Sequence, residues 1–152
     1  LDIIRKAGSV TVHCPDATTN IIAGIMPAKA LSEKGVPIAM GCDIGGGQHA
    51  AVYRQVARAV QLSKLKEFYE PEGNGSITFA QAFHMATKAG GSVFDRAGSL
   101  EKGYRFNALV LDGLEDEGFT LSPEERAERF CYAGDDRNII GRFIDGKEII
   151  LP

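Results

Sequence analysis

The chain has 152 residues, of which 44% are hydrophobic and 24% are charged, and its formal net charge is −3. This composition is typical of one globular domain with a sizeable core, and it excludes a disordered or collagen-like chain. The near-neutral charge argues against a basic nucleic-acid-binding surface, and no apolar run approaches the roughly 20 residues that a membrane helix needs. The three cysteines, Cys14, Cys42 and Cys131, form no CxxC pair, so we expect a cytoplasmic protein without a disulfide framework or zinc ribbon.

Helices and strands are predicted in alternation over the first third of the chain. The amphipathic residues 1–7 end at Gly8, a pattern typical of the last turns of a helix. The next expected elements are a strand over 9–13, a polar loop over 14–24, a helix from Pro27 to Gly35 and a strand over 36–41. Since this second strand is almost wholly apolar, we expect a parallel sheet of the α/β class with both faces covered.

Capping residues and turns define the elements of the remaining chain. A glycine-rich turn over 44–48 precedes a long amphipathic helix over 49–68, and a further helix is expected from Thr78 to Gly90. The last elements are a strand over 107–112, a helix from the Ser122–Glu125 capping box to about Gly134, and a hairpin that turns at Asp145–Gly146. This strand, helix and hairpin indicate a small β-rich subdomain outside the parallel sheet.

Asp43 is the strongest candidate for chemistry. It directly follows the apolar strand that we expect to be buried, and a glycine-rich turn comes next. Active sites of α/β sheets and barrels gather at the carboxyl ends of strands, and a carboxylate there can bind a metal or accept a proton. The alternative is that Asp43 only caps the turn, because Asp before glycine is common in loops.

Two further regions could contribute to a site beside Asp43. His13 ends the first strand, so it either faces the same cleft or is a hydrogen-bonded structural histidine. The polar loop over 14–24 could bind a small polar ligand, although turn formation alone also explains its composition. The loop residues that could make such contacts are Asp16, Thr18, Thr19 and Asn20.

The other polar features have simpler explanations. The glycine run 45–47 lacks the lysine and the spacing of a phosphate-binding loop, so close approach of the backbone to a ligand or to a neighbouring strand is favoured over phosphate binding. Cys42 should point away from a site that contains its neighbour, because adjacent strand residues face opposite sides. We expect His49 at the surface, His84 in helix packing, and residues 115–117 in a solvated loop.

Motifs that follow one another along nearly the whole chain resemble a known family. They are His13–Pro15, Gly24–Pro27, Gly35–Asp43, Ala82–Thr87, Gly98–Gly103, Phe106–Leu111 and Gly134–Ile139. Together they resemble the carboxyl-terminal part of the guanine deaminases, which belong to the amidohydrolase superfamily of metal-dependent hydrolases. The Asp43 motif is similar to one found across the superfamily, whereas Gly134–Ile139 resembles the ending of guanine deaminases in particular.

The resemblance implies a fold and an activity. Residues 1–105 would supply about the last two strands of a (β/α)8 barrel with their helices, and residues 106–152 would return to a small β-sandwich. Asp43 would bind zinc or iron and move the proton, and His13 and Asn20 would bind the substrate. The implied ligand is a purine base rather than a nucleic acid or a membrane, and the implied reaction converts guanine and water to xanthine and ammonia.

The family's other metal-binding histidines have no counterpart in these 152 residues. We therefore expect the chain to be a carboxyl-terminal piece with little or no activity by itself. Because an open piece of a barrel has unpaired strand edges, a homodimer or strand-exchanged oligomer is also expected. Three alternatives remain open: an amidohydrolase acting on another purine, cytosine or a triazine; a noncatalytic self-associating α/β module; and a nucleotide-binding module.

Overall fold

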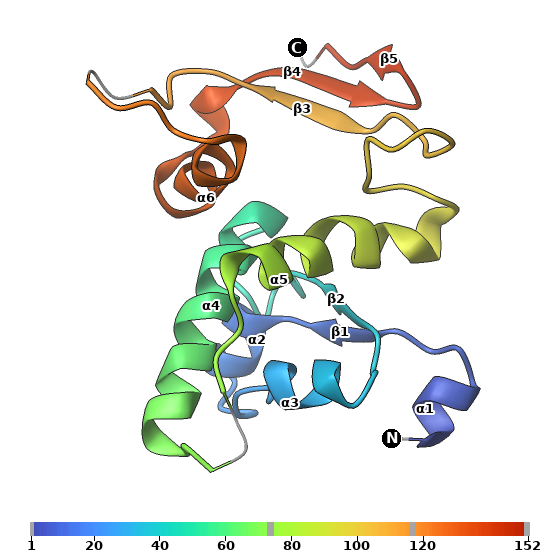
Figure 1. Ribbon diagram of the computed structural model, residues 1–152, viewed down its shortest axis with the longest axis vertical. Helices are drawn as coiled ribbons and strands as arrows, with labels where there is room; N and C mark the ends of the chain where they lie inside the picture. The colour runs from blue at the N-terminus through green and yellow to red at the C-terminus, as the bar shows by residue number, and fades with distance from the viewer. Residues whose placement is uncertain (1, 73–74, 116–117, 151–152) are drawn as a thin grey trace.

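The computed structural model describes residues 2–72, 75–115 and 118–150 (Figure 1). Helices and strands alternate in the first part, and most of the strands come in the last part. In chain order the elements are α1 (Asp2–Lys6), β1 (Thr11–His13), α2 (Pro15–Asn20), α3 (Ala28–Glu33), β2 (Ile38–Met40), α4 (Val52–Tyr69), α5 (Phe79–His84), the π-helical η1 (Met85–Ala89), the 3-10 helix η2 (Ser92–Phe94), β3 (Ala108–Leu111), α6 (Pro123–Ala133), the 3-10 helix η3 (Asp136–Asn138), β4 (Ile139–Ile144) and β5 (Lys147–Glu148).

Strands β1 and β2 form a parallel pair, as the sequence predicts. Thr11 lies opposite Ile38 and His13 lies opposite Met40, and the ladder continues with a hydrogen bond from the Gly41 N–H to the His13 carbonyl. All three residues of β2 are buried, which confirms the expectation from its apolar sequence. The mixed α/β class is therefore confirmed.

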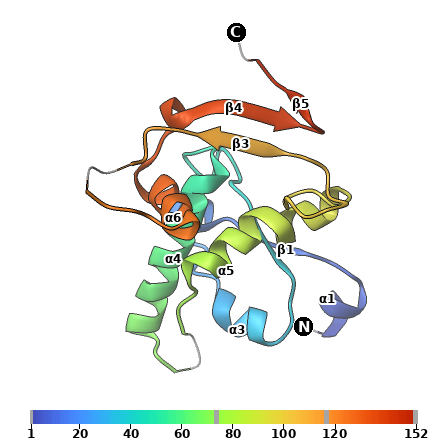
Figure 2. The ribbon, with the colours of Figure 1, turned by 45° about the horizontal axis from the view of Figure 1, so that its top comes forward.

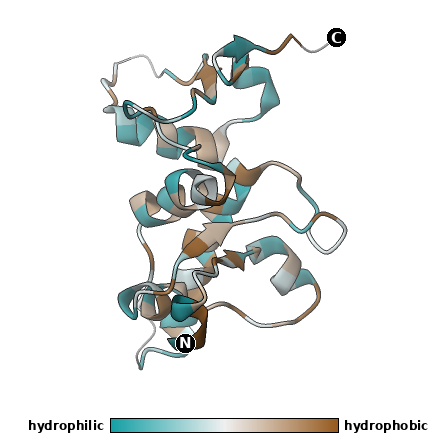
Figure 3. Ribbon diagram, turned by 90° about the vertical axis from the view of Figure 1, so that its right-hand side faces the viewer, coloured by the Kyte–Doolittle hydropathy of each residue, from teal (hydrophilic) through white to brown (hydrophobic). Residues whose placement is uncertain are grey.

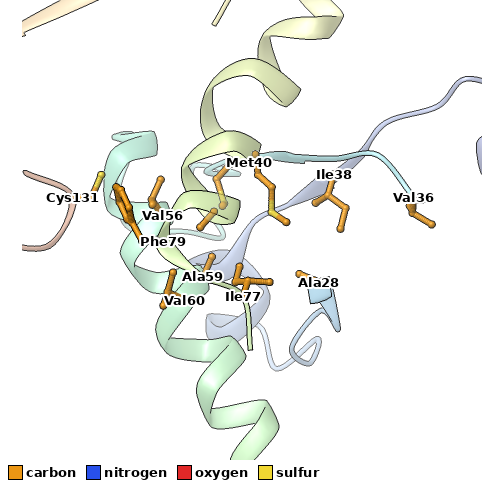
Figure 4. Packing of buried hydrophobic residues seen from close by; sticks show 12 residues of the cluster. Ala28, Val36, Ile38, Met40, Val56, Ala59, Val60, Ile77, Phe79 and Cys131 are labelled. Atoms are coloured by element: carbon orange, nitrogen blue, oxygen red, sulfur yellow. The ribbon is translucent and has the colours of Figure 1, made fainter. Parts of the chain in front are cut away.

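A core of buried apolar side chains joins β2 to the helices (Figure 4). Ile38 and Met40 of β2 pack in one cluster with the buried face of α4, and both α5 and α6 contribute side chains to it. Burial of each large aliphatic side chain stabilises the fold by about 1.5–3 kcal/mol. The buried members of the cluster are Ala28, Val36, Ile38, Met40, Val56, Ala59, Val60, Ile77, Phe79, Ala82, Met85 and Cys131.

Helix α6 is fixed to α4 by its aromatic and sulfur-containing residues. The ring centroids of Tyr53 in α4 and Phe130 in α6 are 4.4 Å apart, and Cys131 is only 5% exposed. Figure 3 shows that the helices carry both hydrophilic and hydrophobic residues along their lengths, as amphipathic helices that cover a core do. The contact between α6 and α4 therefore ties the last part of the chain to the first.

Both capping boxes that the sequence predicts are present. The hydroxyl of Thr78 accepts from the Gln81 N–H at the start of α5, and Ser122 does the same for Glu125 at the start of α6. The predicted end of the first of these helices is less abrupt than expected. Helix α5 passes into η1, and η2 begins just after Gly91.

Gly91 and Gly98 allow two backbone segments to meet after η1. A Cβ at Gly98 would lie 2.1 Å from the Thr87 carbonyl oxygen, and one at Gly91 would lie 2.1 Å from the Ala97 carbonyl oxygen. No side chain can occupy that space, so the chain reverses here only with glycine at both positions. This close contact fixes the path by which the chain leaves the helices.

The last strands form a separate antiparallel sheet in the order β3-β4-β5, which lies above α6 and α4 in Figure 2. Asp145 and Gly146 both have positive φ, 50° and 75°, as a two-residue hairpin turn requires. Arg105 reaches the turn and forms an ion pair with Asp145. The predicted strand, helix and hairpin are thus confirmed, whereas the boundary predicted near residue 105 stays a prediction.

Two predictions about polar residues are wrong. Much of the expected loop over 14–24 is helix α2, whose first residue is Pro15 and whose Thr18 and Thr19 hydroxyls donate back to carbonyls one turn earlier. His84 is exposed rather than packed. Glu115 is exposed as expected, while residues 116–117 lie outside the described residues. Within the described part of the chain, no helix is long and apolar enough to cross a membrane.

Candidate functional site

Asp43 lies three residues beyond the end of β2, at the carboxyl edge of the parallel pair. Its φ is +48°, a left-handed conformation that Asp tolerates better than most residues. Its backbone carbonyl accepts from the N–H groups of Gly46 and Gly47, at 3.1 and 2.8 Å, and so closes the glycine turn. Because the backbone makes these turn bonds, the exposed carboxylate is available for another role.

The glycine turn packs against α2. A Cβ at Gly46 would lie 3.0 Å from the Asp43 carboxylate and 3.2 Å from the Ala17 Cβ, and one at Gly47 would lie 2.5 Å from the Cys42 carbonyl oxygen. The backbone approach at this glycine run is close, but its neighbour is helix α2 rather than the strand that was one of the expected neighbours. Glycine keeps both the carboxylate and the helix within contact of the turn.

Asn20 is the second predicted site residue that lies at this turn. Its side-chain amide donates to the Gly46 carbonyl at 2.9 Å and to Gln48 Oε1 at 2.8 Å. These bonds join the end of α2 to the segment that follows Asp43. The structure thus brings Asn20 and Asp43 to the same turn, although they are far apart in the sequence.

His13 lies on a different face of the strand pair from the residues beside Asp43. The space where a Gly41 Cβ would be is next to the side chains of Val12 and Cys14, so these share one face, and His13 points to the other. That second face carries Met40, which belongs to the core. His13 is accordingly 2% exposed, whereas Val12 is 54% exposed. Instead of opening into a cleft, His13 is part of the buried face.

Burial controls the protonation of His13 and of the nearby thiols. It lowers the pKa of His13 to about 4, and within the described residues no hydrogen-bond partner reaches Nδ1. Burial raises the pKa of Cys14, and the negative charge of Asp43 raises it further. Burial also raises the pKa of Cys42, whose thiol donates to the Ala50 carbonyl at 3.0 Å. Both cysteines are therefore neutral thiols at pH 7, which does not favour a nucleophilic role.

A buried carboxylate, Asp16, lies at the other end of α2. Gln55 Nε2 and Arg58 Nε each donate to one of its oxygens at 2.8 Å, and Gln55 Oε1 accepts from the Asp16 backbone N–H at 3.2 Å. Burial raises the pKa of Asp16, but the hydrogen bonds from Arg58 and Gln55 outweigh this effect and hold the pKa below its ordinary value. Asp16 is therefore a charged, fully engaged group.

This network was not predicted, because the polar sequence around Asp16 indicated a loop. One signal was available: Gln55 lies four residues before Ala59 and seven before Leu62, which is the spacing of the buried face of α4. A glutamine at such a position needs a polar partner inside the protein. The chain position of that partner could not be inferred from spacing alone.

The metal-binding capacity of this region rests on Asp43. In residues 2–72, 75–115 and 118–150, no three His, Cys, Asp or Glu side chains are grouped so that they could hold a metal ion. A hollow of about 520 Å³ lies elsewhere, where α3 and β2 face α5, and His84 and Met85 are part of its lining. None of Asp43, His13 and Asn20 lines that hollow. Asp43 is thus an exposed carboxylate at the carboxyl edge of the strand pair, and it does not lie in a closed pocket.

Comparison with known proteins assigns this arrangement to a family. The sequence profile of the amidohydrolase family matches residues 1–149. The chain belongs to the amidohydrolase family. This membership confirms the superfamily resemblance that the motifs around Asp43 indicate.

Similar amidohydrolases include guanine deaminases. A crystal structure of guanine deaminase from C. acetobutylicum with guanine bound in its active site is 38% identical, with a TM-score of 0.90 over 98% of the chain and 36% of that protein. The guanine deaminase of Dictyostelium discoideum is 27% identical over 98% of the chain and 35% of its own length. A zinc-bound adenosine deaminase from Xanthomonas campestris, 22% identical with a TM-score of 0.73 over 97% of the chain and 33% of its own length, shares the fold. The chain spans about a third of the length of these relatives.

Proposed function

We propose that the whole protein containing these residues is a guanine deaminase, which converts guanine and water to xanthine and ammonia. The observation that carries the proposal is the likeness, at 38% identity and a TM-score of 0.90, to a guanine deaminase with guanine in its active site. The placement of Asp43 at a strand's carboxyl edge supports it, since amidohydrolase-type barrels place their active sites at that edge.

The parallel pair β1–β2 is proposed to be two neighbouring strands of a larger (β/α)8 barrel, and the sheet β3-β4-β5 to belong to a β-sandwich. Val12 supports the first assignment: although it lies in a strand, it is 54% exposed on the face opposite the core. A barrel interior would cover this face with side chains from other strands.

Asp43 is proposed to be the general base and then the general acid of the reaction. Its carboxylate accepts a proton from the attacking water and returns it to the departing amine, so that one group serves both halves of the deamination. Asp43 has no ion-pair partner in the described part of the chain, whereas Asp16 and Asp145 are both paired with arginine. An unpaired carboxylate is free to exchange protons.

A divalent metal fits this site only in part. The Asp43 carboxylate is a suitable oxygen ligand, and the other ligands would have to come from residues beyond those described. Zinc is the proposed ion, with iron as the other candidate; when bound, it lowers the pKa of a water molecule. The substrate-binding roles of His13 and Asn20 stay predictions, and the burial of His13 on the core face leaves Asn20 the better placed of the two.

Replacing Asp43 tests the proposed chemistry. In the whole protein we expect D43N to lower kcat for guanine by about 10²–10⁴-fold, because the amide cannot accept the proton. The measurement is the loss of guanine absorbance, with circular dichroism to show that the fold is kept. D95N is the matched control, because Asp95 is also exposed and has a φ of +56°. Undiminished turnover by D43N would overturn the role of Asp43.

A substrate panel tests the choice of guanine. The whole wild-type protein is assayed with guanine, adenine, adenosine, cytosine and a triazine, and ammonia release is measured. We expect guanine to have the highest kcat/KM. Turnover of another member of the panel without turnover of guanine would reject guanine deaminase activity while keeping the amidohydrolase assignment.

A further inference from the structure

Helix α2 is held at both of its ends by side-chain hydrogen bonds. At its start, Asp16 is bound to Gln55 and Arg58 of α4, and at its end Asn20 is bound to the backbone of Gly46 and the side chain of Gln48. A helix of six residues has little stability of its own, because the cost of nucleation is not recovered over so few turns. These bonds therefore contribute, together with the buried Pro15 and Ala17, to fixing where α2 lies.

The contacts form a continuous path from the core to Asp43. Helix α4 is fixed in the core through Val56, Ala59 and Val60. Gln55 on the same helix is 0% exposed and holds Asp16 through both its amide oxygen and its amide nitrogen. From Asp16 the path runs along α2 to Asn20, and then across to the turn that begins at Asp43.

The turn depends on this support. Gly46 and Gly47 donate to the Asp43 carbonyl, and Gly47 lies against the start of α2, where a Cβ would be 3.4 Å from the Ala17 nitrogen and 3.5 Å from the Asp16 Cβ. Glycines leave the turn with few conformational restrictions of their own. The surface of α2 must supply the missing restriction.

We propose that Asp16 is a positioning residue, which holds the Asp43 carboxylate in its working position through α2 and the glycine turn. The catalytic part of this inference rests on the proposed function, while the structural part does not. Proton transfer is sensitive to displacements of about 1 Å, so a support outside the site can control the rate. Asp16 does this without contact with the substrate.

The donor pattern explains why a carboxylate is needed at residue 16. Both groups that face its side chain, Gln55 Nε2 and Arg58 Nε, are donors, so the side chain must accept on both oxygens. An asparagine side chain has an N–H donor in place of one carboxylate oxygen. That donor would face one of these two donors, so one hydrogen bond would be lost. D16N is therefore a change of the same shape that breaks the network at a defined point.

The experiment uses D16N in the whole protein and two readouts. We expect kcat for guanine to fall about 10–100-fold with a change in KM below about 3-fold. We also expect the amides of Gly46 and Gly47 to exchange with solvent about 10-fold faster, while the amides of Val56 to Val60 exchange at the wild-type rate. The first readout reports on catalysis, and the second reports on the turn directly.

Three companion variants separate positioning from a general structural role. E101Q removes an exposed ion pair, Lys88–Glu101 at 2.7 Å, and should change neither readout. N20A breaks the exposed end of α2 and should accelerate the same two amides without threatening the fold. D16N combined with Q55E returns an acceptor and a negative charge to the network, and should recover part of the lost kcat.

The outcomes distinguish this proposal from the proposed function. Wild-type amide exchange at Gly46 and Gly47 in D16N overturns the positioning role, and equal acceleration throughout α4 overturns it as well, because Asp16 would then support the whole fold. An absence of guanine turnover in the wild type rejects the proposed function. In that case the local exchange in D16N and N20A still decides whether Asp16 positions the turn.

Discussion

The buried His13 makes the stability of the protein depend on pH. Its folded pKa is about 4, below the ordinary value of 6.5. Between these values the unfolded chain binds a proton that the folded chain does not, so the free energy of unfolding falls as the pH falls from about 6.5 to 4. The loss approaches about 3 kcal/mol, and the contribution is constant above pH 6.5.

Urea unfolding from pH 4 to 8 checks this expectation. We expect H13Q, which does not titrate, to lose most of the slope between pH 6.5 and 4, whereas H84Q should retain it because His84 is exposed. Asp16 also destabilises the fold in acid, but only as the pH falls through its lowered pKa, below this window. A slope that persists in H13Q would show that another group is responsible.

At the scale of single residues, the sequence predicted where a residue lies relative to its strand better than it predicted which face its side chain occupies. Asp43 is where the apolar strand and the glycines placed it, because both patterns are local. The face on which His13 lies depends on the register of β1 against β2 and on which face the helices cover. Asp16 could not be recognised as a buried acceptor, since its partners are 39 and 42 residues away in the chain.

At the scale of elements, we expect the capping box of α6 to make a measurable contribution to the free energy of unfolding. S122A removes the hydroxyl that accepts from the Glu125 N–H, and we expect the free energy of unfolding to fall by about 1 kcal/mol. The measurement is the urea midpoint at an unchanged m-value. S9A serves as the control, because Ser9 is an exposed serine outside any helix. Equal midpoints for the two variants would contradict the prediction.

Elements with local signals were predicted, whereas helix α2, which has none, was missed. The capping boxes at Thr78 and Ser122 and the hairpin at Asp145–Gly146 are each specified by adjacent residues. Helix α2 is polar, short and without a side-chain cap, and in the sequence it is indistinguishable from a loop rich in turn-forming residues. Gln55 and Arg58 bind its Asp16 from α4, and tertiary contacts of this kind can override a neutral propensity.

At the scale of the whole molecule, we propose that the chain of 152 residues associates with itself when it is isolated. Val12 on the parallel pair and Leu109, Val110 and Ile140 on the antiparallel sheet are each more than 40% exposed. Apolar strands with such side chains favour pairing with a further copy. We expect light scattering to give a mass above 16.3 kDa that increases with concentration.

A clean monomer at high concentration would reject this association.

The mixed α/β class and the separation of parallel from antiparallel strands could both be predicted, because apolar runs and hairpin turns are visible in the sequence. The packing of α6 on α4 could not be predicted, since the contact of Tyr53 with Phe130 and the burial of Cys131 both join distant segments.

The packing of α6 on α4 has a chemical consequence, because a thiol of α6 is buried in the core. Cys14 and Cys42 are partly exposed, whereas Cys131 lies in the core beside α4, with its pKa raised by burial to about 12. The thiolate is the nucleophile that attacks a thiol reagent, so the folded protein offers two sites for slow labelling and keeps the third closed. The rate at which Cys131 is labelled therefore reports how often α6 separates from the core. No engineered probe is needed for this measurement.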